Sequence, residues 1–147
     1  MSARPKPQSR SAFRLFRAIT TRWSDNDVYG HINNVVYYSY FDTVVNGYLI
    51  EAAALDAQAS ATIGLVVQTH CDYFAPLSFP QVVEAGLRVS QRGNSSVRYE
   101  IGLFAQGADL CAAAGHFVHV YVDRQTRRPA PLSTALKTAL LPLMEPA

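Results

Sequence analysis

The sequence predicts an α+β fold in which one long helix packs against an antiparallel sheet of about five strands. Three observations predict it. A single stretch, 35–56, has apolar residues at the three-and-four spacing of a helix. The segments on either side of it alternate or are rich in β-branched and aromatic residues. The last three of these segments follow one another through short turns, with no helix between them, which is typical of an antiparallel sheet.

The composition fits one globular domain. The chain has 147 residues, of which 49% are hydrophobic and 16% charged, far from the composition of disordered chains. Its formal charge of +2 is mild. The two cysteines lie in apolar runs without a CxxC motif, so no disulfide framework is predicted. No stretch resembles a signal peptide or a membrane span, and we expect a cytoplasmic protein without a membrane partner.

Residues 1–12 are predicted to form a flexible basic tail. No carboxylate precedes Asp25, and prolines and serines between the basic residues favour a solvated tail over an arm that binds nucleic acid or anionic lipid. The basic residues beyond the tail are scattered, so no nucleic-acid partner is expected. From 13 to 23, β-branched and aromatic residues mix with charges, which predicts a strand exposed on one face.

A helix is predicted from Val35 to about Asp56. Its apolar stripe consists of Tyr37, Phe41, Val44, Val45, Tyr48, Leu49, Ala52 and Ala53. The pair Asn46-Gly47 is a poor helix former and could instead indicate a hairpin turn. Alternation fails on both sides of this pair, so we retain the helix and expect Gly47 to mark a close approach of backbone. Asn33 or Asn34 is the expected N-cap.

The remaining segments are predicted to be strands. A β-rich run covers 62–74 and ends before Pro76. The runs 82–90, 96–105 and 110–122, with turns at 92–95 and 106–109, predict an antiparallel meander. Residues 124–147 form a Pro- and Arg-rich extension in which 134–141 fits a short helix. One helix covers one face of a sheet and leaves its edges unpaired, so we expect a homodimer or homotetramer.

The densest polar cluster lies in the loop 24–33, directly before the helix. It contains Asp25, Asn26, Asp27, Gly30 and His31. Unpaired N–H groups at a helix N-terminus suit a developing oxyanion, and a carboxylate just ahead of them suits a nucleophile or general base. From composition alone a structural role is the simpler interpretation, because Asp and Asn satisfy turns and cap helices.

Other catalytic signatures are absent from the sequence. His116 and His119 are three apart on a predicted strand and point to opposite faces, so no metal site is predicted. There is no GxSxG or SxxK motif and no Gly-rich phosphate loop. The turn at 92–96 offers Arg92 and backbone amides to a phosphate, although an ordinary hairpin is the simpler explanation.

Residues 22–41 read RWSDNDVYGHINNVVYYSYF. This run resembles the signature of hotdog-fold thioesterases of the 4-hydroxybenzoyl-CoA thioesterase type. In that family a strand leads into an Asp-x-Asp-x-x-Gly-His-x-Asn-Asn loop and then into a long helix with Tyr and Phe in its first turns. Weaker similarity follows at 73–76, at Ser95-Ser96 and at 115–122. We therefore assign 13–123 to one hotdog thioesterase domain.

The resemblance implies a five-stranded antiparallel sheet curled around the central helix, assembled as dimers and often tetramers. It implies that Asp27 attacks the thioester carbonyl or activates water, and that the backbone N–H near Asn34 polarises this carbonyl. Some relatives carry His or Tyr where this chain has Asn34. His31 would hydrogen-bond within the loop or orient a water, Gly30 would let the loop pass close to substrate, and Asp25 would be structural.

The implied reaction is hydrolysis of an acyl-CoA to the free acid and CoA, with no cofactor and no metal. Residues expected to contact this substrate, besides Gly30, are Tyr37, Arg92, Ser95 and Ser96. Further candidates for the CoA phosphates are Arg124, Arg127 and Arg128. Two alternatives are hydrolysis of acyl groups from acyl carrier protein and acyl-CoA binding without catalysis. Loss of the loop carboxylate would mark the binding module, and Asp27 is present.

Overall fold

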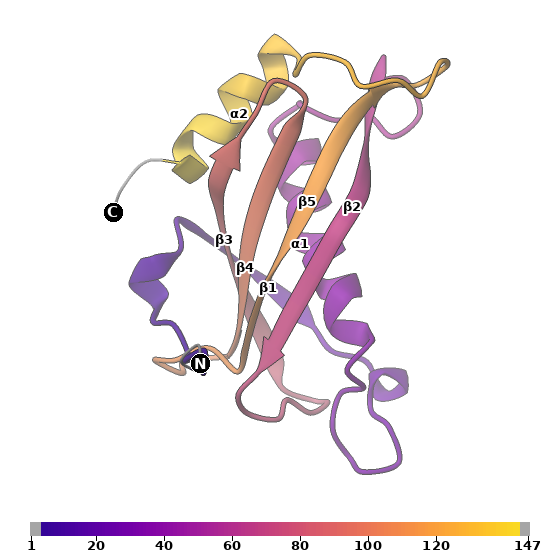
Figure 1. Cartoon of the computed structure of the whole chain (residues 1–147). Helices are drawn as coiled ribbons and strands as arrows, with labels where there is room; N and C mark the ends of the chain where they lie inside the picture. The colour runs from indigo at the N-terminus through magenta and orange to yellow at the C-terminus, as the bar shows by residue number, and fades with distance from the viewer. Residues whose placement is uncertain (1–3, 145–147) are drawn as a thin grey trace.

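One antiparallel sheet of five strands organises the fold (Figure 1). The structure is a computed structural model that describes residues 4–144. The strands are β1 (Leu15–Thr20), β2 (Thr62–Tyr73), β3 (Val82–Arg92), β4 (Ser96–Ala105) and β5 (Ala113–Asp123). Their order in the sheet is β1-β3-β4-β5-β2. The predicted meander is therefore confirmed, and β1 and β2 form the two edges.

Helix α1 (Val36–Glu51) packs across the inner face of this sheet (Figure 1). The helix interpretation of Asn46-Gly47 is confirmed, but α1 ends earlier than predicted. Ala53 adopts a left-handed φ of 56°, and the N–H of Ala54 bonds back to the carbonyl of Leu49. The expectation of a close backbone approach at Gly47 is wrong, because a Cβ placed there meets nothing within 4 Å.

The core lies between α1 and the inner face. Side chains that alternate along β4 point toward the helix and have no exposed surface; they are Val97, Tyr99, Ile101 and Leu103. From α1, Phe41 meets Phe117 of β5 edge to face, with ring centroids 5.5 Å apart. Regular alternation along a strand places these residues on one face, and burial of large side chains stabilises the pairing of helix and sheet.

The N-terminal segment covers part of the outer face. After a 3-10 helix at Arg10–Ala12, Phe13 lies over Gly86 of β3 and Gly102 of β4, where an added Cβ would come within 2.8 and 2.5 Å of its ring. The carbonyl of Gln8 accepts the N–H of Cys111. Residues 8–12 thus differ from the flexible tail expected from the sequence, because glycines on two neighbouring strands make room for an aromatic ring. Residues 1–3 of that expected tail lie outside the described residues.

The C-terminal segment belongs to the same core. Helix α2 (Thr134–Met144) buries Leu136, Leu140 and Leu143 in the cluster formed by α1 and the sheet. The hydroxyl of Tyr48 in α1 donates to the carbonyl of Ala139 in α2. The packed domain therefore continues past the boundary expected at Asp123, while residues 145–147 lie outside the described part. Neither helix is long and apolar enough to cross a membrane within residues 4–144.

Candidate active site

A buried carboxylate anchors the loop between β1 and α1. Asp25 closes a 3-10 helix, Trp23–Asp25, and only 1% of its surface is exposed. Its Oδ2 accepts hydrogen bonds from the Tyr40 hydroxyl at 2.7 Å and the Arg22 N–H at 2.9 Å, and its Oδ1 accepts from the Arg22 guanidinium. Burial alone would raise the pKa of Asp25, but these donors outweigh burial and lower it. Asp25 is therefore a structural carboxylate, as the sequence suggested.

Asp27 lies at the start of a tight turn within the same loop. Its N–H bonds to the carbonyl of His31 at 2.8 Å, and its Oδ1 accepts the N–H of Tyr29 at 2.9 Å. The turn closes through the N–H of Gly30, which bonds to the carbonyl of Asp27. Gly30 has a φ of +80°, so glycine is required here by backbone conformation. The turn holds Oδ1 of Asp27, and no described residue donates a hydrogen bond to its Oδ2.

The start of α1 presents an unpaired backbone donor. The side chain of Asn33 accepts the N–H of Val35 at 3.0 Å, and its carbonyl accepts the N–H of Val36 at 2.9 Å. These bonds form a turn ahead of α1, and the N-cap residue is Val35, without a side-chain cap bond, so the N-cap predicted at Asn33 or Asn34 is wrong. No described residue accepts the N–H of Asn34. The positive end of the α1 dipole adds to this donor. The arrangement is suited to stabilising a negatively charged oxygen.

Asp27 and the first residues of α1 line one open cleft of about 400 Å³. Its lining comprises Asp27, His31, Ile32, Asn34, Tyr37, Tyr73, Phe74, Ala75 and Pro76. The rings of Tyr37 and Tyr73 meet at 4.9 Å between centroids, and the Tyr73 hydroxyl donates to the Asn34 carbonyl at 2.9 Å. Four of the site residues predicted from the sequence therefore line this cleft together: Asp27, His31, Asn34 and Tyr37. Gly30, also predicted, lines an adjoining hollow that shares Asp27.

The connection between β2 and β3 braces the loop. The N–H of Ile32 bonds to the carbonyl of Leu77, the Ser78 hydroxyl donates to the carbonyl of Gly30, and the side chain of Asn26 accepts the N–H of Phe79. Because both sides of the Asp27 turn are held in this way, its carboxylate occupies a defined position beside α1.

The predicted phosphate-binding residues lie at the opposite end of the sheet from Asp27. Tyr73, which lines the Asp27 cleft, pairs with Ala113, whereas Ser96 pairs with Val120 near the other end of β5. Arg92 and Ser95 flank the same distant turn. The guanidinium of Arg124 is engaged by the carbonyls of Ser60 and Ala57. Within one chain, Arg92, Ser95 and Ser96 therefore do not join the Asp27 cleft.

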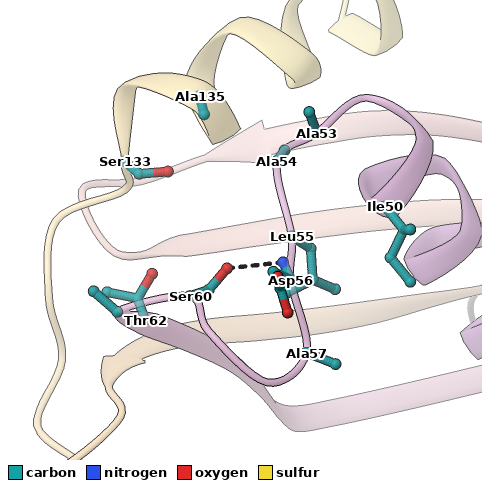
Figure 2. Close-up of a pocket in the computed structure, with 11 residues that line it drawn as sticks. Ile50, Ala53, Ala54, Leu55, Asp56, Ala57, Ser60, Thr62, Ser133 and Ala135 are labelled. Atoms are coloured by element: carbon teal, nitrogen blue, oxygen red, sulfur yellow. Dashed lines mark hydrogen bonds between the residues drawn. The ribbon is translucent and has the colours of Figure 1, made fainter.

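A larger hollow of about 670 Å³ also lies far from Asp27, beside the C-terminal end of α1 (Figure 2). Alanines from the 53–61 segment and Ala135 of α2 form much of its wall. Its carboxylate, Asp56, accepts the N–H groups of Gln58 and Ala59 through Oδ1, while its own N–H bonds to the Ser60 hydroxyl. This hollow lies at the C-terminal end of α1, where the helix dipole is negative and would not stabilise an oxyanion, so the Asp27 cleft is the better catalytic candidate.

Sequence reasoning did not place three contributors to the site. Tyr73 and Phe74 form a wall of the cleft, whereas the sequence marked 73–76 only as the end of a strand with weak family similarity. Tyr40 was left out of the predicted apolar stripe, yet it is buried beneath the loop and holds Asp25. A signal for Tyr40 existed: it lies three residues after Tyr37 and four before Val44, on the same side of the helix.

The fold and this loop define a class of protein. Residues 21–140 match the pattern of the thioesterase-like superfamily, so the chain belongs to that superfamily, and its fold is the hotdog fold. The match includes most of α2, in agreement with the packing of α2 into the core.

Individual proteins resemble the chain in sequence or in fold. The PA5185 protein of Pseudomonas aeruginosa strain PAO1 is 53% identical, with 97% of this chain and 99% of that chain covered and a TM-score of 0.93. Slr0204 of Synechocystis, a 1,4-dihydroxy-2-naphthoyl-CoA thioesterase, shares the fold at 17% identity, covering 85% and 93% with a TM-score of 0.78. YsmA of Bacillus subtilis strain 168 is 26% identical over 93 residues. That match covers 63% of this chain and 63% of YsmA, less than two thirds of its length.

Proposed function

We propose that the protein hydrolyses acyl-CoA thioesters, with Asp27 as the catalytic carboxylate. The observation that carries the proposal is that Asp27 and Asn34, at the start of α1, line one cleft. The Asp-x-Asp-x-x-Gly-His-x-Asn-Asn loop is the reason to prefer the 4-hydroxybenzoyl-CoA thioesterase type within the superfamily. Slr0204, which shares the fold, is a thioesterase for 1,4-dihydroxy-2-naphthoyl-CoA, and this substrate is an acyl-CoA as well.

The chemistry follows from two groups. The N–H of Asn34 and the α1 dipole would hold the thioester oxygen as it becomes negative. Asp27 would either take a proton from the water that attacks the carbonyl carbon or attack that carbon itself and form an anhydride that water then cleaves. In both routes the C–S bond breaks, the sulfur leaves as a thiolate and takes up a proton, and the acid is released.

We further propose that the working unit is a dimer formed along β2. This edge strand exposes Leu65, Val66 and Val67, of which Val67 is 60% exposed. Apolar side chains around the catalytic loop are exposed as well: Trp23, Val28, Tyr29 and Val35. A long apolar edge strand favours pairing with another strand, and a second copy would cover both groups.

Antiparallel pairing of β2 with its copy would also complete the substrate site. The start of the partner's β2 would then lie beside the end of this β2, where Tyr73 lines the Asp27 cleft. Arg127 and Arg128 follow shortly after the end of β5, and this end of β5 pairs with the start of β2. Only across such a dimer would they approach a CoA bound at Asp27.

The decisive experiment is thioester hydrolysis by the Asp27→Asn variant, followed through release of free thiol. We expect turnover to fall by about a thousandfold or more, while the urea-unfolding midpoint and substrate affinity stay close to those of the unchanged protein. Asp109→Asn, in an exposed turn between β4 and β5, is the matched control and should retain full activity. Full activity in Asp27→Asn would refute the assignment. Comparing acyl-CoA with acyl carrier protein substrates identifies the carrier.

A further inference from the structure

A second groove adjoins the catalytic cleft and is formed in part by the N-terminal segment. This groove, of about 620 Å³, is lined by Arg4, Pro5, Lys6, Asp72, Tyr73 and Phe74. Tyr73 and Phe74 also line the Asp27 cleft. The two hollows therefore share one wall, with the carboxylate of Asp27 on one side and two basic residues on the other.

The segment that carries the basic residues of this groove is anchored to the sheet a few residues further on. From Gln8 onward the segment is attached to the outer face: the N–H of Gln8 bonds to Cys111 Sγ at 3.2 Å, and its carbonyl accepts the N–H of Cys111 at 3.0 Å. Arg10 adds bonds to the carbonyl of Ala108 and to Glu84, each of 2.7 Å. Pro5 and Pro7 restrict the backbone between this anchor and Arg4.

Arg4 and Lys6 differ from their basic neighbours in the segments that follow. Arg10, Arg17 and Arg22 are each paired with a carboxylate. Within residues 4–144 no acidic side chain forms an ion pair with Arg4 or Lys6, and both are exposed. The carboxylate of Asp72 also lines the groove, where it lies 3.1 Å from Nε2 of His70. Two cations without acidic partners next to a reaction cleft suit a polyanionic part of the substrate.

We propose that this groove binds the phosphate groups of CoA, with Arg4 and Lys6 of the same chain as the cationic contacts. The inference rests on the proposed thioesterase function and adds a phosphate site to it. The thioester would lie in the Asp27 cleft, the pantetheine arm would pass over Tyr73 and Phe74, and the nucleotide phosphates would reach the basic segment. The negative charge of Asp72 opposes phosphate binding and limits how tightly the product CoA is held.

The test compares two thioesters of the same acyl group, one on CoA and one on pantetheine, which lacks the nucleotide and its phosphates. In the double variant Arg4→Ala with Lys6→Ala, we expect KM for the acyl-CoA to rise about tenfold or more, with kcat unchanged. KM for the acyl-pantetheine should not change. Asp72→Asn should lower KM for the acyl-CoA. Lys137→Ala, which removes an exposed cation from α2, is the matched control and should leave both substrates unaffected.

Calorimetric titration with free CoA measures the groove without any turnover. The unchanged protein should bind CoA about tenfold more tightly than the double variant, and added salt should reduce this difference. Equal affinities, an unchanged KM for acyl-CoA, or an equal rise in KM for both thioesters would overturn the proposal. If the unchanged protein cleaves neither thioester, the proposed function fails, and the CoA titration still decides whether the groove binds phosphate.

Discussion

The hydroxyl of Tyr40 in α1 donates a 2.7 Å hydrogen bond to Oδ2 of Asp25, a carboxylate that is almost completely buried. Burial and the Asp25 carboxylate raise the pKa of Tyr40, so the phenol stays protonated and keeps its donor role. The backbone carbonyl of Asp25 also accepts the N–H of Asn33, at the far end of the loop 24–33. Through its carboxylate and its carbonyl together, Asp25 therefore couples the loop on both sides of Asp27 to the central helix.

Tyr40→Phe tests this coupling. The variant leaves a buried carboxylate with one donor fewer, so we expect the free energy of unfolding to fall by about 1–3 kcal/mol. Urea unfolding at neutral pH measures the change. Tyr29→Phe, which removes a hydroxyl from a residue that is 84% exposed, is the control and should leave stability unchanged. Equal stability of the two variants would contradict the role given to Tyr40.

The proposed oxyanion donor is tested by two substitutions at one position. Asn34→Ala keeps the backbone N–H and should retain most of the thioesterase activity. Asn34→Pro removes this N–H at the second position of the turn 33–36, where proline is favoured, so kcat should fall by about a hundredfold or more. Circular dichroism and urea unfolding confirm that both variants fold. Similar kcat values for the two would show that the Asn34 N–H does not act in the reaction.

The proposed dimer is tested at the exposed edge of β2. Val66→Asp places a charge at an edge strand that we expect to be paired with its copy, and should convert the dimer to a monomer. Light scattering coupled to size-exclusion chromatography measures the mass. Thioesterase activity should fall with it, because the site would lose the partner's contribution. Leu141→Asp, on an exposed position of α2, is the control. A Val66→Asp protein that remains dimeric would exclude β2 as the interface.

Stability should depend on pH through His119. This side chain is 3% exposed, and burial lowers its pKa to about 4 from the 6.5 of an unperturbed histidine. The folded state therefore binds the proton less readily than the unfolded state. The contribution of neutral His119 to the free energy of unfolding is fully present above pH 6.5. It is lost as the pH falls to about 4, and the free energy of unfolding decreases by about 3 kcal/mol. His119→Phe should flatten urea-unfolding free energies over this interval, whereas His31→Gln, at an exposed histidine with no ion pair to a described residue, should not.

Two glycines are expected to respond in opposite directions to alanine. Gly47 lies inside α1 with open space around its Cα, so Gly47→Ala should stabilise the protein by about 0.5–1 kcal/mol. At Gly102 a Cβ would lie 2.5 Å from Phe13, so Gly102→Ala should destabilise it by about 1–3 kcal/mol. Thermal and urea unfolding measure both. A Gly102→Ala variant that is as stable as the unchanged protein, or more stable, would contradict the packing described for Phe13.

Local patterns along the chain predicted the helix, the strands and the polar loop ahead of the helix. The three-and-four spacing after Val35 predicted α1, alternation predicted the strands of the meander, and the motif from Asp25 to Asn34 indicated both the hotdog fold and a carboxylate ahead of a helix. These features are local, because backbone conformation and apolar periodicity depend on residues near one another in the chain.

Contacts between residues far apart in the sequence come from the three-dimensional fold. The fold places Tyr73 beside Asp27, Phe13 over two strand glycines, and Arg4 and Lys6 in a groove next to the Asp27 cleft. It also separated Arg92 from Asp27 by the length of the sheet. Each of these relationships depends on strand order and register, which are set by long-range pairing and core packing, and periodicity along the sequence does not encode them.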